Sequence, residues 1–150
     1  MANRFKLPCA VMLMLIKETI DGEEILLQKR QNTGFADGYY DFSAAGHVED
    51  NESMKKAMCR EAKEELAIEI KEEDLEFVCL IHKNIGEGIY VNIYFKCVRW
   101  DFEPIINEPH KNAEIKWFKI DELPENIIND RKEAIVNYKQ NIKYSQFGWK

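Results

Sequence analysis

Two apolar runs near the start of the chain predict a pair of β-strands. The run CAVMLMLI at residues 9–16 is continuous, and EILLQKR at residues 24–30 follows after a polar segment that contains Asp21 and Gly22. An Asp-Gly pair between two apolar runs is a hairpin signal, because both residues tolerate the positive φ of a tight turn. We therefore predict that these two strands pair with one another.

The next segments differ in their pattern. Residues 31–47 are rich in Gly, Asn and Asp, which predicts a loop with at most short strands. Residues 53–66 repeat apolar positions at helical spacing, and Ser53 is a good N-cap for a helix that begins at Met54. Residues 75–82 indicate a further strand.

Residues 89–98 alternate between two sets of side chains. The first set is apolar: Ile89, Val91, Ile93, Phe95 and Cys97. The second set is more polar: Tyr90, Asn92, Tyr94 and Lys96. A period of two predicts a strand, and we expect one of its faces to be core.

The C-terminal part predicts one more strand and a closing helix. Residues 114–120 read as a strand that ends at the segment 121–124, and residues 130–143 have apolar positions near helical spacing. Because the Asp21-Gly22 pair and the Gly86-Glu87-Gly88 turn both indicate tight hairpins, the sheet cannot be all parallel. We expect one α/β domain over residues 1–150, without repeats or linkers.

Composition limits the class of protein. The chain has 150 residues, 45% of them apolar, which suits one core. The formal net charge of -6 argues against a stable nucleic-acid partner and against anionic membranes, since both need basic surface. Four cysteines show neither a C-x-x-C pair nor zinc spacing: Cys9, Cys59, Cys79 and Cys97. We therefore expect reduced, mostly buried thiols in a cytoplasmic protein.

A secretory signal is the alternative for the N-terminus. Arg4 and Lys6 precede the apolar run, as in the charged region of a signal peptide. The run has only 8 residues, no A-x-A cleavage site follows, and the run is far too short to span a bilayer. A first buried strand explains it better.

The helix predicted at residues 53–66 concentrates acidic side chains beside its buried face. Its apolar residues share one side: Met58, Cys59, Ala62 and Leu66. Glu61, Glu64 and Glu65 lie at helix-neighbour spacings on the adjoining side. These carboxylates therefore border the core and do not point to open solvent.

A solvated helix face is the alternative for these acids, with Glu64 partly offset by Arg60 four residues earlier. Exposed like charges at such spacings cost only a few tenths of a kcal/mol. At the edge of a core, two carboxylates about 6 Å apart repel by roughly 3 kcal/mol, so the cluster needs a cation. Ligands that are all oxygen select hard ions, which favours Mg²⁺ or Mn²⁺.

The stretch from Gly46 to residue 68 resembles the Nudix box, G-x5-E-x7-R-E-U-x-E-E-x-G-U, where U is aliphatic. Six charged or glycine positions agree over 23 residues, including Gly46, Glu52 and the R-E-A-K-E-E run at 60–65. The second glycine of the box is replaced by Ala67. That position follows the helix, where a left-handed backbone is usual, so alanine should cost about 1 kcal/mol if the backbone is unchanged.

The resemblance implies a Nudix-type α/β/α sandwich with a central mixed β-sheet. It also implies metal-assisted hydrolysis of a phosphoanhydride in a nucleoside diphosphate linked to another group. By this resemblance, Glu61, Glu64 and Glu65 hold Mg²⁺ or Mn²⁺, and the carbonyl of Gly46 is a further metal ligand. No organic cofactor is expected.

Other roles also follow from the resemblance. Arg60 orients the glutamates, and Glu52 buttresses the loop and helix. Family members often recruit an acid outside the box as ligand or base, for which Glu108 is the first choice and Glu114 the second. A plain surface role competes with both assignments.

The resemblance to MutT-like Nudix proteins extends to residues 30–40, 43–49 and 114–124. We expect Arg30 to meet outer phosphates, and the aromatic residues, Tyr40 and Trp117 among them, to supply a stacking surface for a base. A solvated strand end competes for Arg30. Core packing competes for the aromatic residues.

The leading expectation is hydrolysis of a nucleoside triphosphate, standard or oxidised, to a monophosphate and pyrophosphate. ADP-ribose, dinucleotides and capped RNA ends remain alternatives. A nucleotide-binding Nudix module without activity and an isopentenyl diphosphate isomerase are alternatives of other classes. The partner expected is a small-molecule nucleotide, and the oligomeric state is open, with a homodimer among the alternatives.

Overall fold

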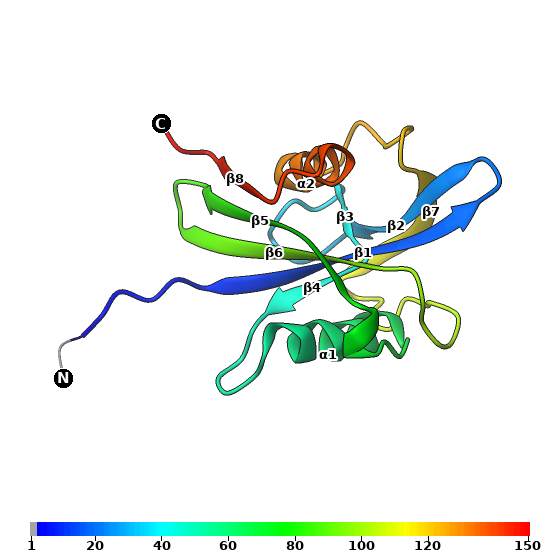
Figure 1. Ribbon diagram of the computed structural model, residues 1–150, viewed down its shortest axis with the longest axis horizontal. Coiled ribbons are helices and arrows are strands. Elements are labelled where there is room, and N and C mark those ends of the chain that lie inside the picture. Colours follow the sequence, from blue (N-terminus) through cyan, green and yellow to red (C-terminus); the bar gives the residue numbers. More distant parts are fainter. Residues whose placement is uncertain (1–2) are drawn as a thin grey trace.

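A mixed β-sheet lies between two helices, with α1 on one face and α2 on the other (Figure 1). The computed structural model describes residues 3–150. The helices are α1 (Met54–Leu66) and α2 (Asn129–Gln140), and the 3-10 helix η1 (Glu72–Asp74) follows α1. The strands are β1 (Cys9–Thr19), β2 (Gly22–Arg30), β3 (Tyr40–Phe42), β4 (Ala44–His47), β5 (Glu76–Asn84), β6 (Ile89–Cys97), β7 (Asn112–Lys119) and β8 (Tyr144–Phe147).

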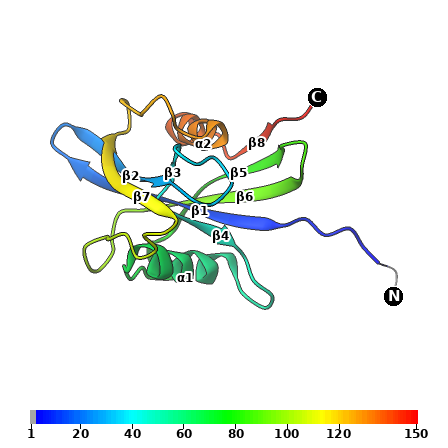
Figure 2. The same ribbon diagram turned by 180° about the vertical axis from the view of Figure 1, so that it is seen from behind.

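The strand order is β3-β2-β1-β6-β5-β8, with β4 paired to β1 and β7 paired to β2. Figure 2 shows β7 beside β2. The β1/β6 and β5/β8 pairs are parallel and the other pairs are antiparallel, so the predicted mixed sheet and α/β/α sandwich are confirmed. Strand β1 pairs with β2 near its C-terminal end and with β4 along Ala10 to Leu13, which brings β4 beside α1.

The sheet is buried on both faces. Helix α1 packs Met58 and Leu66 onto one face, while α2 packs Ala134 and Ile135 onto the other. In β6, Tyr94 is as inaccessible as its neighbours on the opposite face. The expectation of a single core face for this strand is therefore wrong, because a helix covers each side of the sheet.

Helix α1 begins and ends as its sequence predicts. The Ser53 side chain accepts a hydrogen bond from the backbone N–H of Lys56, which makes Ser53 the N-cap. After Leu66 the chain turns at Ala67, whose φ of 56° and ψ of 35° are left-handed, and the Ala67 N–H donates to the carbonyl of Lys63. The backbone thus keeps the conformation that favours glycine, although the residue is alanine.

The C-terminal elements differ from the prediction. Helix α2 stops at Gln140, because Asn141 adopts a left-handed conformation and its N–H returns to the last carbonyls of the helix. Residues 144–147 then form β8, an edge strand parallel to β5 that the sequence pattern did not predict. Within residues 3–150, no helix is both long enough and apolar enough to cross a membrane.

Candidate functional site

Arg60 joins the acidic groups of α1 to the preceding loop. Its guanidinium donates to both carboxylate oxygens of Glu52, at 2.7 and 3.0 Å. It also donates to Glu61 at 2.8 Å, to Glu64 at 3.3 Å and to the carbonyl of His47 at 3.2 Å. One planar cation therefore fixes three carboxylates and the end of β4 relative to one another.

The Glu52 contact lies where the loop enters α1. Hydrogen bonds from Arg60 and from the backbone of Glu49 lower the pKa of Glu52 to about 2. The same contact with Glu52, helped by Glu61, raises the pKa of Arg60. This pair stays ionised at any physiological pH and ties the loop to the helix.

Glu61 lies directly against Gly46 in β4. A Cβ added at Gly46 would overlap the Glu61 carboxylate, so the approach depends on glycine. Burial raises the pKa of Glu61 even though Arg60 opposes the shift. The carboxylate is held in a desolvated position where the neighbouring cation only partly offsets the loss of water.

Glu65 is the most buried acid of the helix. Its Oε2 accepts a hydrogen bond of 2.8 Å from the backbone N–H of Ala45 in β4. Burial raises the pKa of Glu65 to about 9, and the charge of Glu61 adds to the effect. A second positive charge at this point would therefore strongly favour the ionised form.

The donor set suits a hard divalent cation. Glu61, Glu64 and Glu65 present carboxylate oxygens on one side of α1, and two of these carboxylates are desolvated beside one another. Among residues 3–150 no three acidic, histidine or cysteine side chains already surround one point. The carboxylates of Glu61 and Glu64 are instead both paired with Arg60.

The loop that carries Glu108, the first choice for the acid outside the box, covers the C-terminal end of α1. The Asn107 side chain donates to the carbonyl of Glu64 at 2.9 Å, and its backbone N–H donates to the carbonyl of Glu65 at 3.1 Å. The next residue is Glu108, whose charge adds to the burial that raises the pKa values of Glu61 and Glu65. The structure thus brings Glu108 near the acids of the box, with Lys111 at 3.6 Å from its carboxylate.

Glu114 lies in a different environment. Its Oε1 accepts a hydrogen bond of 2.7 Å from the Tyr40 hydroxyl, which with burial raises the pKa of Tyr40 to about 12. The Tyr40 ring packs edge-on against Phe118, with 5.1 Å between ring centroids. Both side chains are therefore engaged in the packing between β3 and β7.

A cavity of about 490 Å³ adjoins the acidic site. It reaches Ala45 and Gly46 on β4, and Arg30 and Phe35 line another part of it. Arg30 donates to Asp41 at 3.1 Å and to the carbonyl of Phe35 at 2.8 Å, so its guanidinium is held at the cavity. Because the cavity and the acids of α1 meet at β4, one ligand can contact both.

Two residues predicted to bind substrate lie outside this cavity. Tyr40 is buried against Phe118, as described above. Trp117 stacks on Trp100, with ring centroids 6.0 Å apart, on the α1 side of the sheet. Of the three predicted residues, the structure brings Arg30 alone to the cavity lining.

The sequence analysis missed the polar residues of the cavity floor. Lys83 Nζ lies 3.1 Å from Asp130, and Asn92 donates to the same carboxylate at 3.3 Å. Arg131 donates to Asp130 at 2.6 Å and to Asp41 at 2.7 Å. Lys83 and Asn92 occupy inward positions of strands, where a polar side chain is a signal that could have been read.

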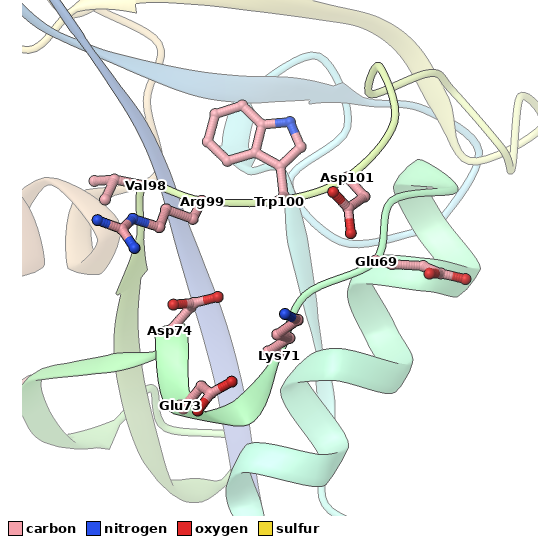
Figure 3. A pocket seen from close by; sticks show the side chains of 8 residues that line it. All are labelled: Glu69, Lys71, Glu73, Asp74, Val98, Arg99, Trp100 and Asp101. Atoms are coloured by element: carbon pink, nitrogen blue, oxygen red, sulfur yellow. The ribbon is translucent and has the colours of Figure 1, made fainter.

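A second and larger cavity, of about 720 Å³, lies elsewhere (Figure 3). None of its lining residues belongs to the acidic cluster of α1; they are Glu69, Lys71, Glu73, Asp74 and residues 98–101. In Figure 3, Arg99 and Glu69 extend to opposite sides, so the charged groups do not converge on one point. We therefore assign the site to the β4 side of α1.

Comparison with known proteins identifies the family and the fold. Residues 7–138 match the family model of the NUDIX domain. The fold resembles that of a MutT NUDIX hydrolase from Burkholderia pseudomallei, with a TM-score of 0.76, 23% sequence identity, and 89% of this chain and 98% of that chain covered. It also resembles a MutT protein from Methanosarcina mazei Go1, with a TM-score of 0.72, 19% identity, and 93% and 100% coverage.

A third solved structure contains a ligand. The NUDIX domain of Shewanella oneidensis NrtR, in complex with ADP ribose, has a TM-score of 0.72 and 16% identity, with 93% of this chain and 91% of that chain covered. Curated protein sequences give no significant match. Because these sequence identities are low, the likeness to the solved structures shows the fold alone. The family itself is shown by the match over residues 7–138.

Proposed function

Because this chain belongs to the Nudix family, we propose that it hydrolyses a nucleoside triphosphate, standard or oxidised, to the monophosphate and pyrophosphate. The chain is a Nudix pyrophosphohydrolase, and all the charged positions of the box are present in it. The observation that carries the proposal is the pair of desolvated carboxylates, Glu61 and Glu65, at the edge of a cavity large enough for a nucleoside.

Divalent ions are the cofactors of this family, and here we propose Mg²⁺ or Mn²⁺, held by Glu61, Glu64 and Glu65 with the carbonyl of Gly46. When bound, such an ion neutralises charge on phosphate oxygens and lowers the pKa of a bound water. The protein supplies the orientation, because Arg60 and Glu52 hold the helix and the preceding loop in register.

Glu108 is our candidate for the acid outside the box. It lies on the loop that is hydrogen-bonded to the end of α1, near Glu61 and Glu65. In that position a carboxylate can accept the proton of an attacking water or contribute a further oxygen ligand. Glu114 is the weaker choice, because the Tyr40 hydroxyl already donates to its carboxylate.

ADP-ribose and dinucleotides are the second class of substrate. The relative that carries ADP ribose has the same fold, which supports this class as well. A panel of nucleoside triphosphates, ADP-ribose, dinucleoside polyphosphates and isopentenyl diphosphate, each with Mg²⁺, distinguishes the alternatives through the products released. Pyrophosphate from triphosphates supports the proposal, and the absence of turnover of any nucleotide refutes it.

The variants Glu64→Gln and Glu65→Gln test the acidic site. Each removes one negative oxygen ligand without changing side-chain volume, so we expect turnover to fall by at least about 100-fold. Circular dichroism should show an intact fold. Glu76→Gln is the matched control, because Glu76 is an exposed acid on β5, and its activity should equal that of the wild type. Retained activity in both site variants would remove these residues from the mechanism.

A further inference from the structure

The cavity beside β4 has aromatic walls and a polar floor. Phe35 stands at its opening with 43% of its surface exposed, and Arg30 lies 5.2 Å from the Phe35 ring centroid. On another wall Tyr90 stacks with His47, with 6.2 Å between ring centroids and 20° between planes. A flat aromatic ligand could stack against these walls.

The floor carries more positive than negative charge. Its three cations are Arg30, Lys83 and Arg131. Their carboxylate partners are Asp41 and Asp130, so these five groups leave one positive charge in excess, and Glu87 on the exposed turn is a third carboxylate of the cavity. A ligand seated on this floor is therefore favoured if it presents electron-rich oxygen atoms.

The carboxylate that lines the cavity floor is already occupied by donors. Asp41 accepts hydrogen bonds from Arg30, from Arg131 and from the backbone N–H of Phe42. Glu87, the other carboxylate of the described lining, lies on the exposed turn between β5 and β6. The Asp41 carboxylate thus already has its donors, so a ligand that needs to donate finds no free carboxylate on the floor.

Lys83 has donors to spare beside the aromatic wall. Its ammonium carries three N–H donors and no acceptor, and the structure gives it one hydrogen-bond partner, Asp130. Its Nζ lies 5.6 Å from the centroid of the Tyr90 ring, beside the aromatic wall. Lys83 is only 6% exposed, so few waters can satisfy the remaining donors.

We propose that this cavity seats the base of the nucleotide, and that Lys83 selects bases that present a carbonyl oxygen over bases that present an amino group at the same position. The substrate class is then a nucleoside triphosphate with an oxo base, such as hypoxanthine, guanine or uracil. This inference rests on the proposed function, from which it takes the hydrolysis of a triphosphate. The preference between bases depends only on the floor of the cavity.

Hypoxanthine and adenine nucleotides make the sharpest comparison, because their rings differ at the oxo or amino group and at the adjacent nitrogen. An oxo group accepts from Lys83, whereas an amino group places a donor against a donor and leaves the spare N–H groups of the buried ammonium unpaired. We expect inosine triphosphate to exceed adenosine triphosphate in kcat/KM by about 10- to 100-fold.

The binding experiment is independent of turnover. Titration calorimetry of the wild-type protein with inosine monophosphate and with adenosine monophosphate should show a similar preference for the inosine compound. Equal affinities would overturn the inference, whether or not the protein hydrolyses triphosphates. Conversely, a preference in binding without any hydrolysis would support the inference and refute the proposed reaction.

Lys83→Met removes the ammonium and retains most of the stem, while Arg131 remains as a partner for Asp130. It should abolish the preference between the two nucleotides. Lys116→Met is the matched control, because Lys116 is exposed on β7 outside the cavity lining, and the preference should persist. A preference that survives in Lys83→Met would overturn the role of Lys83.

Phe35→Ala tests the wall and does not depend on the buried network. Phe35 is exposed, so the variant should fold. It should lower the affinities for inosine monophosphate and adenosine monophosphate by a similar factor of about 10, so that the ratio of the two affinities stays unchanged. Unchanged affinity for both would exclude this cavity as the seat of the base. The comparison of inosine monophosphate with adenosine monophosphate on the wild-type protein needs no variant. It tests the inference even if Lys83→Met does not fold.

Discussion

At the scale of single residues, the site depends on side chains that are held away from water. Gly46 allows the Glu61 carboxylate to lie against β4, and the N–H of Ala45 holds Glu65. Both glutamates have raised pKa values because burial disfavours their charge. Their position is therefore costly without a cation and favourable with one.

Gly46→Ala should separate activity from stability. The added methyl overlaps the flexible end of Glu61, so that side chain must move, whereas the backbone around Gly46 can stay in place. We expect hydrolysis to fall by about 100-fold and the free energy of unfolding to change by less than about 1 kcal/mol. Ala113→Gly, at an exposed position of β7 outside the cavity lining, is the control; equal activity in Gly46→Ala and wild type would contradict the close packing.

At the scale of elements, helix α1 is defined by its two ends. Ser53 caps the first turn, and Ala67 closes the last turn in a left-handed conformation. That conformation strains any residue with a Cβ. The helix therefore carries strain at the point where the Nudix box has glycine.

Ala67→Gly should stabilise the protein. Relief of the left-handed strain is worth about 1 kcal/mol, which corresponds to a rise in Tm of roughly 2–4 °C for a domain of this size. Thermal unfolding measures it. Lys56→Gly inside α1 should act in the opposite direction, because glycine is a poor helix former. A lower Tm for Ala67→Gly would show that the backbone is not strained there.

The sequence predicted the elements whose signals are local. The alternation at residues 89–98, the Ser53 cap and the spacing of the acids on α1 each lie within a short window, and the structure has a strand or helix at each place. Strand β8 was missed because Tyr144 to Phe147 has no strong apolar alternation, and its pairing with β5 comes from tertiary contacts. The cavity floor was missed for a similar reason, since it joins β3, β5, β6 and α2 across the fold.

At the scale of the whole molecule, buried charges connect α2 to the sheet. Burial opposes the charge on Asp130, but Arg131 and Lys83 outweigh it and lower the pKa of this carboxyl. For Arg131, likewise, burial opposes the charge and Asp41 and Asp130 outweigh it, so its pKa is raised. These groups link β3, β5 and α2 into one unit.

Asp130 should therefore contribute to acid stability. A carboxyl with a lowered pKa in the folded state stabilises the protein above its unfolded pKa of about 4, and the contribution disappears as pH falls through the folded value. Asp130→Asn should cost roughly 3 kcal/mol at pH 7, because Lys83 and Arg131 lose a buried partner.

Urea unfolding at several pH values measures this effect. The difference in stability between wild type and Asp130→Asn should be constant from pH 7 to about pH 5 and should shrink below about pH 4. Asp121→Asn is the control, since Asp121 is an exposed acid paired only with Lys139 at the surface. A difference that grows as the pH falls would contradict the lowered pKa.

The central claim is that the carboxylates of α1 accept a divalent cation beside a nucleotide. A crystal structure with Mn²⁺ and a non-hydrolysable triphosphate analogue tests it most directly, since anomalous scattering locates the ion. We predict Mn²⁺ bound by Glu61, Glu64 and Glu65 and by phosphate oxygens, with the base in the cavity beside β4. Ions bound elsewhere, with these carboxylates still paired to Arg60 and Ala45, would contradict the account.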